Sequence, residues 1–179
     1  MSMQRIIVMG SSAGAGKSTF ARRLGEILTL PVYHLDVLFW KPGWVESDSD
    51  DFVAAQRERA AESRWIFEGN YTDTYAIREA FADTLIYLDV PLSVSLWRVI
   101  KRRLLYRRRI RPDIAPGCPE KIDGRFLWFI LSTYHRRRPK MAQRIESFRQ
   151  TGRPAIVLRG QRQQQKFLQE QLRAHHANP

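Results

Sequence analysis

The sequence predicts a three-layer α/β fold in which a five-stranded parallel sheet is flanked by helices. Short apolar runs alternate with longer amphipathic stretches, a pattern typical of strand–helix–strand units around a parallel sheet. Prolines fall between these stretches, where regular backbone hydrogen bonding must end. The length of 179 residues suits one core, so we expect a single domain over residues 1–179.

Each expected element follows from its pattern. The strands are the short apolar runs, at residues 5–9, 32–35, 65–68, 85–89 and 155–158. The helices are the longer amphipathic stretches, at residues 16–28, 50–63, 73–80, 92–108, 121–137, 140–149 and 161–173. Pro31 and Pro154 stand directly before strands, Pro91 stands before the helix at 92–108, and Pro139 separates two of the later helices. The one low-complexity stretch is a run of glutamines at 163–165.

Residues 110–124 interrupt this alternation. The segment has three prolines, two glycines and few periodic apolar residues, so it predicts a loop of fifteen residues. Loops of that length are uncommon in a compact domain and are usually functional lids or disordered segments. We therefore expect a mobile basic lid, within a lid-like insertion at about residues 107–138.

The positive charge is concentrated in one segment. The chain has a net charge of +12, and residues 98–140 contain fourteen Lys and Arg against three acids, a local balance of +11. Such a balance indicates an acidic partner, which leaves phosphates, nucleic acid and anionic lipid as classes. Cys118 is the only cysteine, which excludes an internal disulfide and makes a reducing cytoplasm the expected compartment. No apolar run is long enough to span a bilayer, so we expect no membrane partner.

A glycine-rich turn between the first strand and the first helix carries the strongest signal. Gly16, Lys17 and Ser18 fit the phosphate-binding loop template G-x-x-x-x-G-K-[ST], although Ser11 occupies the first template glycine and Gly10 stands one place early. Such a loop directs backbone N–H groups at phosphates, its lysine reaches the β- and γ-phosphates, and its serine offers a ligand to Mg²⁺. The motif therefore predicts ATP and Mg²⁺ as cofactors. The expected nucleotide-binding loop residues are Ser12, Ala13, Gly14, Ala15, Gly16, Lys17, Ser18 and Thr19.

Three carboxylates stand where predicted strands end. Asp36 follows the second strand, Glu68 ends the third and Asp89 ends the fourth. Ligands of open parallel sheets bind beyond these strand ends. We expect Asp36 to act as a catalytic base that also contacts the acceptor, and Glu68 to bind Mg²⁺ through water. Helix capping or a surface salt bridge is the alternative for each, and the stronger interpretation for Asp89.

The helix at 92–108 adds arginines. At about 100° per residue, Arg98, Arg102 and Arg109 lie within roughly 40° of one another on one helix face. Arginine forks match phosphate oxygens, so we expect Arg98 to bind the nucleotide and Arg102 to stabilise charge on the transferring phosphoryl group. A solvated helix face is the alternative. The expected acceptor-binding residues are Asp36, Trp40, Lys41, Asn70, Tyr71 and Arg78, with core or surface roles as alternatives.

These motifs together resemble the DNA topology modulation (FlaR-like) proteins, a bacterial group related to adenylate kinase. The resemblance covers roughly residues 5–160 and includes the phosphate loop, HLD at 34–36, WKPGW at 40–44, GNY at 69–71, IR at 77–78, LD at 88–89, RPD at 111–113 and GCPE at 117–120. It implies a P-loop kinase-like fold in which Arg98 packs on adenine, Arg102 contacts phosphates, and Arg159 and Gly160 belong to the loop that lines the adenine pocket. The turn at 69–71 lacks the Pro-Arg that adenylate kinases carry there.

Two functions fit these observations. The first is an ATP-dependent kinase that moves the γ-phosphoryl group of ATP to a small-molecule or nucleotide acceptor. The second is an ATP-binding protein that associates with DNA through its basic segment, weakly and without sequence preference, and affects DNA topology. A base at Asp36 serves phosphoryl transfer but is not needed for binding a nucleic-acid backbone, which favours the kinase. We expect a monomer or a small homo-oligomer.

Overall fold

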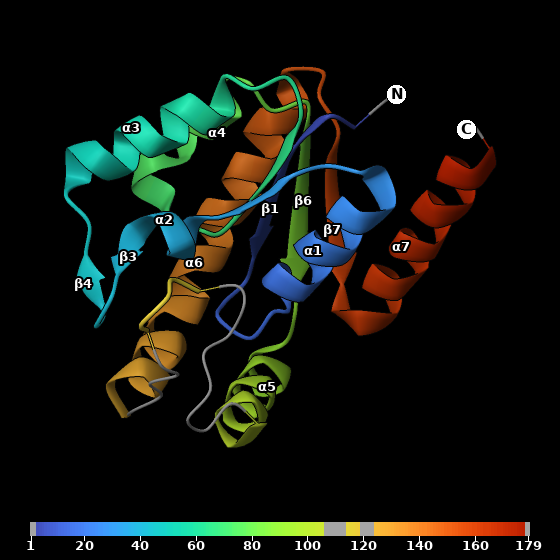
Figure 1. Ribbon diagram of the computed structural model, residues 1–179. Coiled ribbons are helices and arrows are strands. Elements are labelled where there is room, and N and C mark those ends of the chain that lie inside the picture. The colour runs from blue at the N-terminus through green and yellow to red at the C-terminus, as the bar shows by residue number, and fades with distance from the viewer. Residues whose placement is uncertain (1–2, 106–113, 119–123, 178–179) are drawn as a thin grey trace.

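Five parallel strands form the central sheet, in the spatial order β2, β5, β1, β6, β7 (Figure 1). The computed structural model describes residues 3–105, 114–118 and 124–177. Each strand matches its predicted run to within one residue, and all four pairings between neighbours are parallel. The strands are β1 (Arg5–Gly10), β2 (Val32–His34), β5 (Trp65–Glu68), β6 (Thr84–Asp89) and β7 (Ala155–Arg159). The predicted fold class is confirmed.

Helices cover both faces of the sheet. Successive strand residues point to opposite faces, so Ile6 and Val8 pack with α1 and α7, whereas Ile7 and Met9 pack on the side of α3, α4 and α6. Within the described ranges, none of the helices combines the length and apolar character needed to cross a membrane. The helices are α1 (Lys17–Leu28), α2 (Leu35–Phe39), α3 (Ser49–Ala60), the short 3-10 helix η1 (Thr72–Thr74), α4 (Tyr75–Glu79), α5 (Leu92–Leu105), α6 (Gly124–Gln150) and α7 (Gly160–Ala177).

The helix α6 runs through Pro139, where the sequence predicted a break between two helices. Proline lacks an N–H group, so the carbonyl of His135, four residues earlier, loses its helical donor. Both residues are exposed, and water can bond that carbonyl. The buried residues Tyr134 and Met141 continue one packed face across the proline, which explains why the helix persists.

A short helix and a small hairpin follow β2, and neither was predicted. The chain forms α2 and then a two-stranded hairpin of β3 (Trp40–Lys41) and β4 (Val45–Glu46) before it enters α3. Residues 114–118 pack against this hairpin, where Ile114 and Cys118 are buried beside Trp40 and Trp44. The Gly43 N–H donates to the Gly117 carbonyl at 3.0 Å. Of the predicted lid loop at 110–124, the structure thus describes a part that docks on the hairpin; residues 106–113 and 119–123 lie outside the described residues.

Candidate active site

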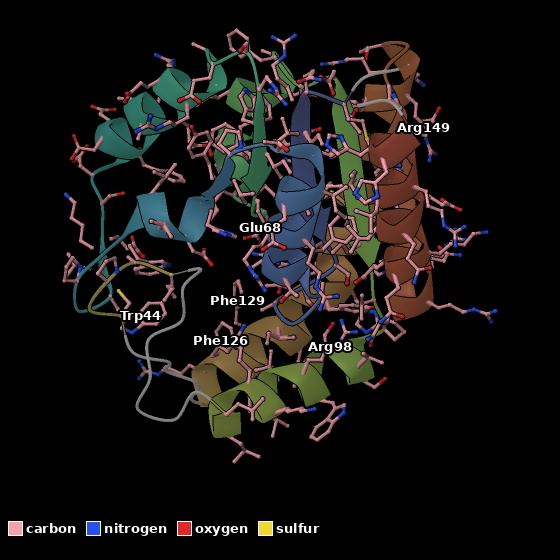
Figure 2. The ribbon with its side chains drawn as sticks, turned by 45° about the vertical axis from the view of Figure 1, so that its right-hand side comes forward. Trp44, Glu68, Arg98, Phe126, Phe129 and Arg149 are labelled. Carbon is pink, nitrogen blue, oxygen red and sulfur yellow. The ribbon has the colours of Figure 1, made fainter. Side chains whose placement is uncertain are left out.

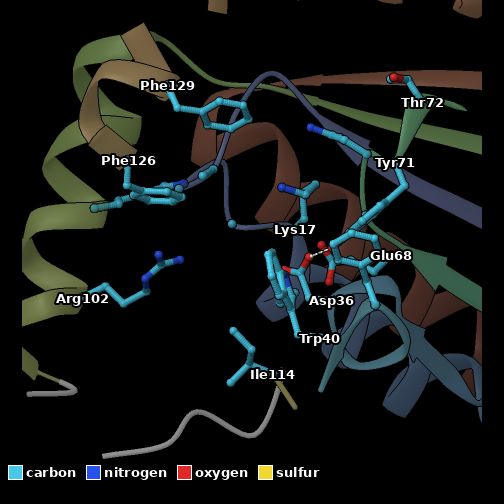
Figure 3. A pocket seen from close by; sticks show the side chains of 18 of the residues that line it. Lys17, Asp36, Trp40, Glu68, Tyr71, Thr72, Arg102, Ile114, Phe126 and Phe129 are labelled. Atoms are coloured by element: carbon cyan, nitrogen blue, oxygen red, sulfur yellow. Dashed lines mark hydrogen bonds between the residues drawn. The ribbon is translucent and has the colours of Figure 1, made fainter. Parts of the chain in front are cut away.

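A cavity of about 870 Å³ lies at the carboxyl edge of the sheet. This is where open parallel sheets bind ligands, because the loops that follow the strands diverge there. Figure 2 shows Glu68, Trp44, Phe129 and Arg98 grouped around it, each from a different element. Other lining residues come from the phosphate loop and α1, from α2 and the hairpin, from the turn after β5 and η1, from α5 and α6, and from the segment 114–118 (Figure 3). They include Lys17, Ser18, Asp36, Trp40, Asn70, Tyr71, Thr72, Asp73, Arg102, Ile114, Arg125, Phe126 and Arg137.

The contacts of Ser11 explain why the phosphate loop has a serine where the template has its first glycine. The buried Ser11 hydroxyl donates to the Val90 carbonyl at 3.0 Å and accepts from the Val90 N–H at 3.2 Å, which ties the loop to the end of β6. The glycine one place earlier is needed for close approach. A Cβ on Gly10 would lie 3.0 Å from Cγ of Lys17, so the absent side chain leaves room for the lysine stem to fold across the strand end. The Lys17 ammonium lies 3.3 Å from the Ser12 carbonyl.

Gly14 fixes the distance between the phosphate loop and α5. Its φ of +84° belongs to the left-handed region that favours glycine, and a Cβ there would lie 2.3 Å from the carbonyl oxygen of Ser95. This close contact places Arg98 beside the loop, where its guanidinium donates to the Ala15 carbonyl at 3.2 Å. The loop and the first arginine of the basic helix therefore form one rigid unit.

Replacing Gly14 by alanine should damage this unit. We expect Gly14→Ala to destabilise the fold by about 1–3 kcal/mol more than Gly43→Ala, because the added methyl group must displace the backbone of α5. Gly43 is the matched control, since its φ is +81° but nothing lies within 4 Å of its missing Cβ. Chemical denaturation measures both changes. Equal losses in the two variants would show that α5 does not press on the loop.

Asp36 and Glu68 both line this cavity, and each has a hydrogen-bonding partner. The Tyr71 hydroxyl donates to Oδ1 of Asp36 at 2.7 Å (Figure 3), and Nδ1 of His34 lies 2.7 Å from Oε2 of Glu68. Burial and the nearby Asp36 carboxylate raise the pKa of Tyr71, so its hydroxyl stays protonated and remains a donor. Asp89 is placed elsewhere: it pairs with Arg138 at 3.1 Å and does not line the cavity.

The Tyr71 hydroxyl should tune Asp36. A donor stabilises the charged carboxylate and lowers its pKa, so Tyr71→Phe should raise that pKa and move the acidic limb of the pH–rate profile upward by about one pH unit. The measurement is kcat/KM against pH with the acceptor found in the screen below. Tyr75→Phe is the control, because the buried Tyr75 hydroxyl has no partner among the described residues. An unmoved limb in Tyr71→Phe would mean that Asp36 does not titrate in catalysis.

Two residues predicted to bind the acceptor are not part of the cavity. Lys41 is exposed on the hairpin, and its ammonium lies 3.6 Å from Asp51. Arg78 is fully buried beneath the site, where it bonds the side chain of Gln56 and, at 3.2 Å, the carbonyl of Tyr71. Burial lowers the pKa of Arg78 to about 10. Arg78 therefore holds the turn after β5 and cannot reach an acceptor.

Replacing Arg78 should destabilise the fold around the turn after β5. We expect Arg78→Leu to lower the free energy of unfolding by about 3 kcal/mol, because Gln56 and the Tyr71 carbonyl lose a charged donor while remaining buried. Arg57→Leu, on the exposed side of α3, should change it by less than about 0.5 kcal/mol. Denaturant titration compares the two. A small effect at Arg78 would contradict a structural role.

Asn70 lines the cavity but its amide is engaged. It accepts from the Gly10 N–H and donates to the Gly10 carbonyl, both at 3.0 Å, and so clamps the start of the phosphate loop. Of the residues predicted to bind adenine, Arg98 lies at the loop, while Arg159 and Gly160 line neither this cavity nor the smaller one described below. The Arg159 N–H instead bonds the Gln163 side chain at 2.7 Å.

The helix α6 contributes lining residues that were not among the predicted site residues. Arg125, Phe126, Phe129 and Arg137 line the cavity from this helix. The Arg137 guanidinium lies 4.8 Å from the centroid of the Phe129 ring, and burial lowers the pKa of Arg137. The charge run at 136–138 was the available signal, but it does not say which arginine faces inward.

The cavity is strongly cationic. Its lining carries five cations, Lys17, Arg98, Arg102, Arg125 and Arg137, against three carboxylates, Asp36, Glu68 and Asp73. A surplus of guanidinium and ammonium groups beside the phosphate loop suits a polyphosphate.

The oxygen ligands that line the cavity could hold Mg²⁺ only together with phosphate oxygens of a bound nucleotide. Mg²⁺ takes oxygen ligands and keeps several waters, and Ser18 and Glu68 supply a hydroxyl and a carboxylate to the same cavity. Among the residues that the structure describes, no group of three His, Cys, Asp or Glu side chains would hold a metal ion. The remaining ligands would therefore be phosphate oxygens and water.

Solved kinases share this fold. The chain is similar to a gluconokinase from Sinorhizobium meliloti 1021, at a TM-score of 0.55 and 17% identity over 98% of this chain and 93% of that chain. It is equally similar to a shikimate kinase from Bacteroides thetaiotaomicron, at a TM-score of 0.55 and 18% identity over 97% of this chain and 99% of that chain. No family model and no curated protein matches the sequence. The chain thus shares the fold of these two kinases, and the resemblance to topology modulation proteins stays a prediction.

Proposed function

We propose that the protein is an ATP-dependent kinase that phosphorylates a hydroxyl group of a small molecule. The observation that carries the proposal is that Lys17 of the phosphate loop and Asp36 line one cavity, which places a phosphate-binding cation and a candidate base on the same bound ligands. Two proteins of similar fold are named gluconokinase and shikimate kinase, and small-molecule phosphorylation is the activity that we extend from them to this chain.

The proposed reaction assigns a role to each group. The acceptor hydroxyl oxygen attacks the γ-phosphorus, the bond from that phosphorus to the β–γ bridging oxygen breaks, and ADP leaves. Asp36 orients the hydroxyl and takes its proton, held in place by Tyr71. Lys17 and Arg102 stabilise the charge that develops on the transferring group. Mg²⁺, bound through Ser18, water and Glu68, would neutralise the β- and γ-phosphates.

The aromatic wall supports a small, partly apolar acceptor. Phe39, Trp40, Trp44 and Tyr71 line the cavity on the side of Asp36, and their rings contact one another at 4.9–5.4 Å between centroids. Ile114 closes the same wall from the segment docked on the hairpin. Closing an active site against water protects the γ-phosphate from hydrolysis.

The DNA-binding alternative has less support. Binding to a nucleic-acid backbone uses cations on an outer surface. Lys101, Arg136 and Lys140 are exposed in this way, but four arginines of the same segment line the cavity: Arg98, Arg102, Arg125 and Arg137. A concave site of this kind suits the phosphates of one bound nucleotide better than a continuous strand.

A turnover screen tests the proposal. Purified protein with Mg·ATP is incubated with panels of polyols, hydroxy acids, nucleosides and nucleotides, and ADP release is followed in a coupled assay. We expect one chemical class to stimulate ADP release in the wild type but not in Asp36→Asn. ADP release that responds to DNA and to no small acceptor would favour the alternative.

A further inference from the structure

A second, smaller cavity adjoins the phosphate loop. Its volume is about 280 Å³, and it shares Gly16, Thr19 and Arg98 with the main cavity. A molecule whose phosphates lie on the loop can therefore extend into it. The remaining lining residues come from α1 and α7 and are Phe20, Arg23, Gln161, Gln164, Gln165 and Leu168.

The wall formed by Arg98 is held in place. Its guanidinium donates to the Ala15 carbonyl at 3.2 Å and to Oε1 of Gln161 at 3.1 Å. These two bonds occupy both terminal nitrogens and orient the plane of the group. A flat, weakly hydrated guanidinium stacks well on an aromatic ring, so this wall suits a planar base.

Gln164 is the unusual residue of this cavity. Its side chain is buried, at 7% exposure, and its amide nitrogen Nε2 has no hydrogen-bond partner among the described residues. Its Oε1 lies 3.8 Å from the position that a Cβ on Gly16 would take, so the amide stands directly beside the phosphate loop. A buried amide donor without a partner is costly, and a ligand that pairs with it regains that cost. The terminal torsion of glutamine is soft, and pairing with a ligand would require a rotation about it that turns the amide nitrogen toward the cavity.

We propose that Gln164 recognises the adenine base of the nucleotide and selects ATP over GTP. A glutamine amide carries one donor and one acceptor side by side, and this pair matches the exocyclic amine and the neighbouring ring nitrogen of adenine. Guanine presents two acceptors, O6 and N7, at the corresponding edge, so the amide oxygen would face another oxygen. Among the described residues no carboxylate lines the cavity, and its neutral polar side chains are Thr19 and the three glutamines. The inference rests on the proposed function for the position of the phosphates and goes beyond it by naming the residue that chooses the base.

Calorimetric titrations with ATP, GTP and inorganic tripolyphosphate, each with Mg²⁺, test the proposal. We expect the wild type to bind ATP about 5- to 150-fold more tightly than GTP, the range that one bidentate amide–base pair provides. Gln164→Leu should lose most of that preference and should bind tripolyphosphate as the wild type does. Gln163→Leu is the matched control, because Gln163 is the adjacent glutamine on the same helix but bonds the Arg159 N–H outside the cavity.

A second variant guards against loss of folding. Gln164→Met keeps a side chain of similar length but removes both the donor and the acceptor, so it should also lose the preference for ATP, and melting curves report the fold of both variants. An unchanged ATP-to-GTP ratio in the folded Gln164 variants would overturn the proposal. So would tripolyphosphate binding as tightly as ATP, because the base would then contribute nothing. A wild type that binds neither ATP nor tripolyphosphate would instead contradict the phosphate loop, and with it the proposed function.

Discussion

Asp36→Asn should lower kcat by about 10²- to 10⁴-fold with the acceptor found in the screen, the usual contribution of a positioned general base. The substitution keeps the size of the side chain and its ability to accept from Tyr71, which is 2.7 Å from Oδ1. It removes the group that takes the proton. The affinity for ATP should change little, because phosphate binding depends on the loop and the arginines. Steady-state kinetics with separate ATP and acceptor titrations distinguish the two effects.

Asp73→Asn provides the matched control for this experiment. Asp73 also lines the cavity, but it lies in η1, on the other side of the turn after β5. Loss of a carboxylate there changes the charge of the site by the same amount without removing the proposed base. An equal loss of kcat in both variants would show that Asp36 acts only through its charge. Near-normal kcat in Asp36→Asn would show that turnover does not need Asp36. Either result would remove Asp36 as the base of the mechanism.

The three central strands, β1, β5 and β6, were predictable because they are buried on both faces. Parallel strands in such a position read as continuous apolar runs, as Trp65 to Glu68 and the first strand do. The hairpin at Trp40 was not predictable, since strands of two residues carry no period. The helix break predicted at Pro139 was wrong, because the packing of the buried residues Tyr134 and Met141 on either side of the proline outweighs its local effect.

Positions at strand ends could be predicted from topology, but side-chain partners could not. Asp36 and Glu68 follow strands of one parallel sheet, and the cavity brings them together as expected. Asn70 and Tyr71 were assigned to the acceptor, whereas their side chains bond Gly10 and Asp36. Those contacts join residues 60 and 35 positions apart in the chain, and nothing in the local pattern encodes them.

Nucleotide binding should depend on Lys17. A ligand that binds only the native state stabilises it by RT ln(1 + [L]/Kd), so Mg·ATP at about 100 times Kd should stabilise the wild type by about 2.7 kcal/mol. Lys17→Ala should lose most of this gain, because the ammonium that reaches the β- and γ-phosphates is gone.

The fold itself should survive the Lys17 substitution. The lysine stem lies over Gly10, and among the described residues its ammonium bonds the Ser12 carbonyl, so little packing is lost. Thermal melting of Lys17→Ala with and without Mg·ATP makes the comparison, and Lys41→Ala, an exposed lysine outside the cavity, should keep the full shift. Because the turnover screen and the base-selection experiment both assume phosphates on this loop, an undiminished ATP-induced shift in Lys17→Ala would move the nucleotide elsewhere and invalidate both.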